Sequence, residues 1–231
     1  MNRVQDAKAL TFDLFGTILD LGGSLRPHIE KFLTRKGVEV SADRFWDQWR
    51  ARQRIEQFQD TIMMVGHAGY LETVRRAFVY TLALNGMESS ADEVKQVMAS
   101  WQELSPFPEV RVALERLKDR YKLVVLSNGD PDFLEHLVKN RVDWAFDDVI
   151  SVTEFGAFKP HPTVYLGAAG ILGLEAGECL MVSANSFDVV GARACGLKGA
   201  FVNRNRFPYD DSPYRPDLTV EDFTGLADVL L

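Results

Sequence analysis

Near its start the chain reads Leu10-Thr11-Phe12-Asp13-Leu14-Phe15-Gly16-Thr17, an apolar run that ends in a carboxylate and is followed at once by Gly and Thr. A buried strand that ends in Asp and then turns sharply exposes a reactive group at the carboxyl edge of a parallel α/β sheet. Asp13 is therefore a candidate nucleophile. In isolation such an aspartate is more often a turn or helix-cap residue, so its interpretation depends on the rest of the chain.

The rest of the chain contains strand-like and helical segments. Strand-like runs occupy residues 9–12, 123–126, 149–152, 180–182 and 200–202, and helical patterns separate the later ones. Strands joined by helices predict right-handed crossovers and a parallel sheet. The predicted fold class is therefore α/β, with a parallel sheet flanked by helices.

Residues 21–104 differ from this pattern because they contain no convincing strand. They predict helices over about 25–36, 42–63 and 70–84, and a fourth helix that begins at the capping-box sequence Ser90-Ala91-Asp92-Glu93. The predicted breaks between these helices are Gly37, Gly66, Gly69 and Asn85-Gly86.

The chain is thus predicted to form two parts. Residues 1–20 and 105–231 form a core, and residues 21–104 form an all-helical insertion after the first strand. The prolines of Ser105-Pro106-Phe107-Pro108 are expected to resist regular structure and to return the chain by an extended path. Because clefts between such parts commonly bind small molecules, the site is expected between them.

Polar groups follow three of the later predicted strands. They are Ser127-Asn128-Gly129, Phe158-Lys159-Pro160 and the run from Val182 to Asp188. The carboxyl ends of parallel strands meet at one edge of the sheet, so these groups are expected beside Asp13. A lysine there would favour the ionised carboxylate and stabilise negative charge during a reaction. Each segment also has a structural alternative, namely a turn corner, a solvated lysine or a helix cap.

These four segments, in this order and with these separations, resemble the four motifs of the haloacid dehalogenase superfamily. The resemblance implies a Rossmann-like core with an all-helical cap domain. Two departures define the branch, because phosphate-ester hydrolases of the superfamily carry acidic residues where this chain has Phe15 and Ala184. A departing alkoxide needs a proton donor whereas a halide needs none, and magnesium needs hard oxygen ligands. The pattern resembles the L-2-haloacid dehalogenases, which implies no metal and no organic cofactor.

The resemblance also assigns catalytic roles. The catalytic residues would be Asp13, Thr17, Lys159, Ser183, Asn185 and Asp188. Asp188 would pair with Lys159 and act on the attacking water. Thr17 would hydrogen-bond near the nucleophile, and Ser183 and Asn185 would fix the geometry. Polar residues after a strand could instead cap the following helix.

A second set of residues would bind the substrate. It consists of Phe15, Arg50, Tyr70, Ser127, Asn128, Tyr165 and Phe187. Ser127 would help hold the substrate carboxylate, Asn128 would contribute to the halide cradle, and Tyr165 would line the site. The other aromatic residues would surround the alkyl group, and Phe15 and Phe187 stand where the best-known members carry Tyr and Trp. The two tyrosines could equally be ordinary packing residues.

Arg50 is the candidate halide-binding arginine. In Phe45-Trp46-Asp47-Gln48-Trp49-Arg50 it directly follows a tryptophan, as this arginine does in the L-2-haloacid dehalogenases. Helical spacing places Arg50 on the inward face with the tryptophans and Gln53. Arg52 and Arg54 are expected to fall to the sides of that face.

The predicted reaction is the hydrolysis of a short (S)-2-haloalkanoate to an (R)-2-hydroxy acid through an ester on Asp13. Three alternatives remain open: a related hydrolase that opens a strained ring beside a carboxylate, a phosphatase, and a catalytically silent binding protein. The partners implied are a small 2-haloacid and a halide, and the resemblance implies a homodimer through the cap.

Composition narrows the remaining possibilities. The chain has 231 residues, 46% of them hydrophobic, and a net charge of −7, which argues against nucleic acid or anionic membranes as main partners. No stretch approaches the roughly 20 apolar residues of a membrane span, and the start shows no signal-type region, so a cytoplasmic location is expected. Cys179 and Cys195 are too few for a disulfide framework and are expected to be buried and inert. The histidines lack metal-ligand spacing; they are His28, His67, His136 and His161.

Overall fold

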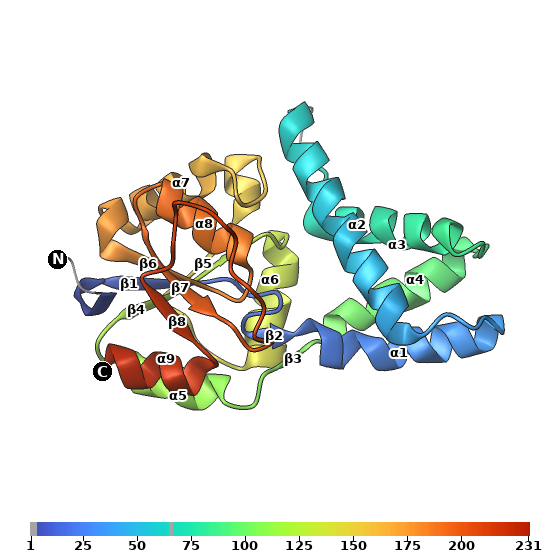
Figure 1. Cartoon of the computed structure of the whole chain (residues 1–231), viewed down its shortest axis with the longest axis horizontal. Coiled ribbons are helices and arrows are strands. Elements are labelled where there is room, and N and C mark those ends of the chain that lie inside the picture. Colours follow the sequence, from blue (N-terminus) through green and yellow to red (C-terminus); the bar gives the residue numbers. More distant parts are fainter. Residues whose placement is uncertain (1–3, 65–66) are drawn as a thin grey trace.

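The computed structural model describes residues 4–64 and 67–231, which form a six-stranded parallel sheet with helices on both faces (Figure 1). The strand order is β5-β4-β1-β6-β7-β8. The strands are β1 Ala9–Phe12, β4 Lys122–Ser127, β5 Asp148–Ser151, β6 Cys179–Ser183, β7 Lys198–Val202 and β8 Leu218–Val220. The predicted α/β class and parallel sheet are confirmed, whereas β8 was not predicted because it is only three residues long.

The helices of the core lie in two layers. In Figure 1, α5 (Val110–Leu117) and α9 (Phe223–Leu230) cover one face of the sheet, and α7 (Pro162–Leu172) and α8 (Ser186–Ala194) cover the other. A further helix, α6 (Pro131–Leu137), follows β4. Short 3₁₀ segments lie at Val4–Asp6, Ser100–Glu103, Val152–Phe155 and Ala176–Glu178, and a π-helical turn lies at Val138–Val142.

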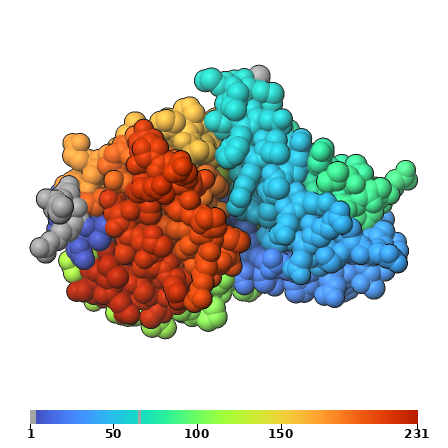
Figure 2. All heavy atoms as spheres, viewed as in Figure 1, coloured from blue at the N-terminus to red at the C-terminus, as the bar shows by residue number. Residues whose placement is uncertain are grey.

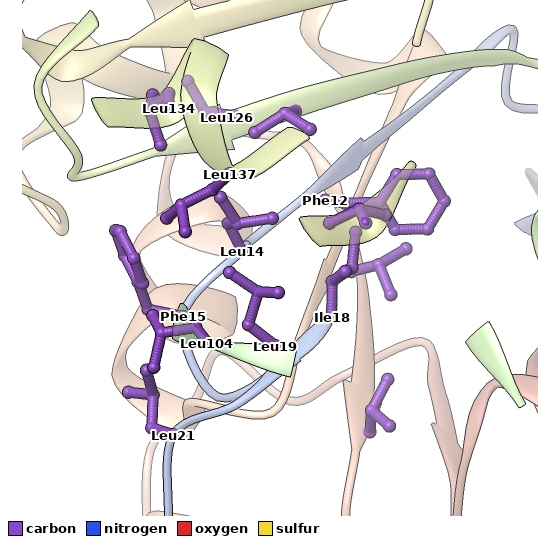
Figure 3. Packing of buried hydrophobic residues seen from close by; sticks show 14 of the residues in the cluster. Phe12, Leu14, Phe15, Ile18, Leu19, Leu21, Leu104, Leu126, Leu134 and Leu137 are labelled. Carbon is purple, nitrogen blue, oxygen red and sulfur yellow. The ribbon is translucent and has the colours of Figure 1, made fainter. Parts of the chain in front are cut away.

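The strand that carries Asp13 is central and buried. β1 lies between β4 and β6, and no residue of β1 is more than 1% exposed, which explains its apolar run, since both faces of a parallel sheet are covered. Gly16 then turns the chain with a φ of +85°, which favours glycine. Figure 3 shows side chains of β1 and this turn gathered with Leu134 and Leu137 of α6 in the core. The packed turn fixes Asp13 at the carboxyl edge of the sheet.

Four further helices stand beside the core, and we call them the cap helices. They are α1 Leu21–Lys36, α2 Ala42–Met63, α3 Tyr70–Leu84 and α4 Ala91–Ala99. The predicted ranges of α2 and α3 and the capping box before α4 are confirmed. α1 begins four residues earlier than predicted, because Asp20 accepts a hydrogen bond from Gly23 N at 2.8 Å and caps it there. The predicted break at Gly66 lies outside the described residues, and the range 21–104 for a cap domain stays a proposal.

The chain leaves and re-enters the core at one place. β2 (Leu19–Asp20) pairs antiparallel with β3 (Ser105–Pro106). The predicted extended return is therefore present. The expectation that the prolines resist regular structure is wrong for Pro106, which lies in β3, and holds for Pro108, which lies in a turn. Pro106 has no N–H group to donate, and the N–H of the neighbouring Phe107 donates to the Ile18 carbonyl at 3.0 Å.

A carboxylate of the core also binds the first turn of one of the cap helices. Asp130, just before α6, accepts hydrogen bonds from Tyr70 N at 3.0 Å and Leu71 N at 3.3 Å, at the beginning of α3. The preceding Gly69 has a φ of +87°, and a Cβ there would lie 2.8 Å from Asp130 Oδ1. Unpaired N–H groups at a helix start favour a carboxylate, so this contact holds α3 against the core.

In residues 4–64 and 67–231, no helix has both the length and the apolar character of a membrane span.

Candidate active site

The two carboxylate oxygens of Asp13 have different surroundings. Oδ2 accepts hydrogen bonds from Thr17 Oγ1 and Asn185 Nδ2, both at 2.8 Å, and a longer one from Ser183 Oγ at 3.4 Å. Oδ1 accepts none from the described residues, and Lys159 Nζ lies 3.7 Å away. Because Asp13 is only 6% exposed, this difference is maintained by the protein rather than by solvent. Oδ2 is therefore fixed, and Oδ1 is the oxygen that is available to react.

A buried ion pair lies beside Asp13. Lys159 Nζ is 3.0 Å from Asp188 Oδ2, and Tyr165 Oη donates to Asp188 Oδ1 at 2.7 Å. Burial raises the pKa of Asp188 above its ordinary value, and the ammonium of Lys159 opposes this shift. Asn128 Oδ1 accepts a hydrogen bond from the backbone N–H of Lys159 at 2.9 Å and so fixes the lysine loop to the end of β4.

These groups surround a small inner pocket between the core and the cap helices. It is lined by Asp13, Phe15, Arg50, Arg54, Gln57, Tyr70, Asn128, Lys159, Asn185, Phe187 and Asp188. Its water-accessible volume is about 20 Å³, which is room for about one water molecule. The rings of Phe15 and Tyr70 stack at 4.1 Å and form one wall, and burial raises the pKa of Tyr70 to about 12.

The groups around Asp13 do not suit magnesium, which many phosphate-transferring relatives of such a fold bind. The side chains that reach Oδ2 are hydrogen-bond donors, and Ala184 has no oxygen in its side chain. Asp188 is occupied by Lys159 and Tyr165. Among the described residues, no group of three His, Cys, Asp or Glu side chains is arranged to hold a metal ion.

The family model described as "haloacid dehalogenase-like hydrolase" matches residues 7–196. The chain belongs to this hydrolase family. The resemblance seen in the four motifs is thereby confirmed.

Named relatives agree with this assignment. Haloacetate dehalogenase H-2 of Moraxella sp. (strain B) is 34% identical over 217 residues, covering 92% of this chain and 93% of that protein. The (S)-2-haloacid dehalogenase of Xanthobacter autotrophicus is 34% identical over 198 residues, covering 85% and 75%. A structure of the L-2-haloacid dehalogenase from X. autotrophicus with chloropropionic acid covalently bound has a TM-score of 0.83 and 28% identity, covering 97% and 98%.

Four predicted site residues of this haloacid dehalogenase-like hydrolase lie outside the pocket wall. Thr17 and Ser183 lie behind Asp13 and reach Oδ2. Ser127 is fully buried, and its Oγ accepts a hydrogen bond from Gly129 N at 3.3 Å. Tyr165 lies behind Asp188 rather than lining the site as expected. It packs under Gly191 of α8, where a Cβ would lie 2.8 Å from its ring.

Sequence reasoning missed two residues of the wall, Arg54 and Gln57. Arg54 was expected at the side of α2, but its Nη2 donates to Asn185 Oδ1 at 3.3 Å and its guanidinium lies 5.7 Å from the Phe187 ring centre. Residues four apart on a helix share a face, so the spacing from Arg50 could have revealed it. Arg52 does point elsewhere, since it pairs with Glu56 and lies over the ring of Tyr80.

A larger outer cavity of about 520 Å³ adjoins the inner pocket. It lies between the core and the cap helices, whose surfaces meet along the boundary seen in Figure 2. The residues that it shares with the inner pocket are Arg50, Arg54, Asn185 and Phe187. The outer cavity thus connects the inner pocket to its surroundings past the two arginines.

The cysteines and histidines take no part in either cavity. Cys179 is buried as predicted, and burial raises its pKa to about 11. Cys195 differs from the prediction because it is only half-buried.

Proposed function

We propose that this protein is an (S)-2-haloacid dehalogenase, which converts short (S)-2-haloalkanoic acids into (R)-2-hydroxy acids through an ester on Asp13, without a metal ion. The observation that carries the proposal is the unequal pair of Asp13 oxygens, one held by three donors and one facing the pocket. Phe15 supports it, since the phenyl ring has no acidic proton with which to protonate an alkoxide. The names of the relatives, which are haloacetate and (S)-2-haloacid dehalogenases, point to the same chemistry.

In the first step, Oδ1 of Asp13 attacks C2 of the substrate from the side opposite the halogen. The new C2–Oδ1 bond forms as the carbon–halogen bond breaks, the halide leaves with the electron pair, and C2 is inverted. Lys159 favours the ionised nucleophile, and Arg50 and Asn128 stabilise the departing halide. The near absence of water raises the reactivity of a weakly nucleophilic carboxylate.

In the second step, water attacks Cγ of the Asp13 ester. Asp188 accepts a proton from the water, and negative charge develops on Oδ2. The donors already bound to Oδ2, namely Thr17, Ser183 and Asn185, stabilise that charge. The Cγ–Oδ1 bond then breaks, Oδ1 leaves in the hydroxyl group of the product, and the proton passes to that oxygen.

A single turnover in oxygen-18 water tests the proposal. Enzyme in excess over (S)-2-chloropropionate, with a chelator present, is expected to yield unlabelled (R)-lactate and one oxygen-18 atom in the peptide that contains Asp13. Direct attack of water on C2 would label the lactate and leave the peptide unchanged. A requirement for magnesium, or release of phosphate from a generic ester instead of chloride from the haloacid, would also contradict the proposal.

The pH dependence of kcat should reflect the protonation of Asp188. Burial raises its pKa, so Asp188 gains a proton at a higher pH than a surface aspartate, and the proton-accepting form is lost as the pH falls through that value. The groups that face it are Lys159, Tyr165 and Asp13. Tyr165→Phe removes a hydrogen bond to the ionised form, so the acid side of the kcat profile should move to higher pH by about one unit.

The matched control for this measurement is Tyr121→Phe. Tyr121 Oη donates to the Leu230 carbonyl at 2.9 Å, far from Asp13 in the fold, so its loss should leave the profile in place. An acid side that stays unchanged in Tyr165→Phe would mean that a group other than Asp188 limits the rate there.

A further inference from the structure

We infer that Arg54 is a specificity-determining residue that binds the substrate carboxylate at the mouth of the inner pocket, and that Arg50 is thereby left to the halide. The inference deepens the proposed function, on which it rests, by naming the residue that holds the substrate carboxylate. Arg54 lines both cavities, as Arg50 does, so a carboxylate that crosses from the outer cavity meets both guanidinium groups.

The first support is the absence of an acidic partner. In the described part of the chain, the other arginines of the outer cavity are paired with carboxylates, Arg26 with Asp43 and Arg204 with Glu109. Arg50 and Arg54 form no ion pair there; they hydrogen-bond to the amides of Gln53 and Asn185 and lie over the rings of Trp46 and Phe187. Two neighbouring guanidinium groups repel each other, and partial burial together with Arg50 lowers the pKa of Arg54, while Asp13 opposes this shift. An anion from outside the protein would relieve this repulsion.

The second support is the charge balance of the pocket. Its wall holds three cations, Arg50, Arg54 and Lys159, and two carboxylates, Asp13 and Asp188. The excess of one positive charge matches one monoanionic substrate. Once Asp13 is esterified, the three cations face Asp188, the bound carboxylate and the halide, and the charges balance again. Without Arg54, three negative charges would face two cations, which is unfavourable.

The third support is an unpartnered donor in the pocket wall. Gln57 lies one helical turn after Arg54 on α2 and is only 5% exposed, yet its Nε2 has no hydrogen-bond partner among the described residues. Buried polar groups are nearly always hydrogen-bonded, so this amide is suited to an acceptor on the ligand. A carboxylate held by the planar guanidinium of Arg54 would supply one.

The assignment of the substrate carboxylate to Arg54 and of the halide to Arg50 follows from the shapes of the two anions and from how deeply each arginine is buried. Both arginines line the outer cavity, but Arg54 is the more exposed of the two, whereas Arg50 packs on Trp46 and hydrogen-bonds to Gln53. A guanidinium fork matches the two oxygens of a carboxylate, while a spherical halide needs no such match.

The test measures binding and turnover in Arg54→Gln and Arg54→Lys. Calorimetric titration with propionate, which has no leaving group, is expected to show affinity about tenfold or more weaker in Arg54→Gln, because a charge-assisted hydrogen bond is lost. Arg54→Lys keeps the charge without the fork and should fall between. Bromide affinity should change less than propionate affinity. The KM for (S)-2-chloropropionate should rise by a larger factor than kcat falls.

Arg52→Gln is the matched control, since Arg52 lies on the same helix, pairs with Glu56 and lines neither cavity. Unchanged propionate binding in Arg54→Gln would overturn the inference. So would a loss confined to kcat, which would mean that Arg54 acts only by orienting Asn185, or a larger loss of bromide than of propionate affinity. If the wild-type protein released no halide yet bound propionate through Arg54, the proposed function would fail and the carboxylate site would stand.

Discussion

Asp13→Asn is expected to reduce halide release from (S)-2-chloropropionate by at least about 10⁴-fold, because the amide lacks the negative charge that attacks carbon. The substitution keeps the size of the side chain, and Thr17 can still donate to its oxygen. The fold should therefore be preserved, since the turn after β1 is held by packing and by Gly16. Chloride release in the first minutes is the measurement, with mass spectrometry to verify that the amide has not hydrolysed.

The matched control is Asp222→Asn, which changes an aspartate that caps α9 by accepting a hydrogen bond from Gly225 N at 2.9 Å. Asparagine caps helices about as well as aspartate does, so activity and stability should stay near wild type. Substantial dehalogenation by intact Asp13→Asn protein would remove the basis of the proposed mechanism.

Lys159→Met should have the second largest effect, and it should lower both stability and activity. Lys159 is 1% exposed and is the cation beside two buried carboxylates. Removing one member of a buried ion pair typically destabilises a protein by about 3–5 kcal/mol, because the remaining charge is left unpaired. The free energy of unfolding in urea at neutral pH measures this loss. Halide release should fall by about 10²-fold or more, because Asp13 and Asp188 no longer share a positive neighbour.

A double variant separates the two effects. In Lys159→Met/Asp188→Asn the negative charge of Asp188 is also removed and only that of Asp13 remains, so part of the lost stability should return while dehalogenation stays low. Equal stability of Lys159→Met and the wild type would show that Lys159 does not balance these carboxylates.

The sequence predicted the core of the site because strand ends determine it. Asp13 and Asn128 directly follow buried parallel strands, and Asp188 lies in the first turn of the helix after β6; such positions meet at one edge of a sheet whatever the details of packing. The direction of individual side chains was harder to predict. Ser127 and Asn128 are consecutive, and consecutive side chains along a strand point to opposite sides, so only Asn128 lines the pocket.

Contacts between segments far apart in the sequence could not be predicted from local patterns. The stacking of Phe15 on Tyr70 depends on how α3 rests on the core, and nothing near either residue encodes that angle. The helix that starts at Leu21 was missed in part because Gly22 and Gly23 are poor helix formers, and the cap from Asp20 outweighs this preference. Arg54, in contrast, follows from helical spacing alone.

The capping of α3 by Asp130 affects how this enzyme could be re-engineered or could diverge. A helical insertion that is joined to the core only where the chain leaves and re-enters it could be exchanged as a unit between relatives. Here, however, the first turn of α3 depends on a carboxylate of the core. A donor insertion would have to bring a residue without a side chain at the position of Gly69, where a methyl group would collide with that carboxylate. Chimaeras that ignore this pairing should lose the alignment of Tyr70 with the nucleophile even when both halves fold. Recombination between relatives would therefore be expected to keep the two positions together.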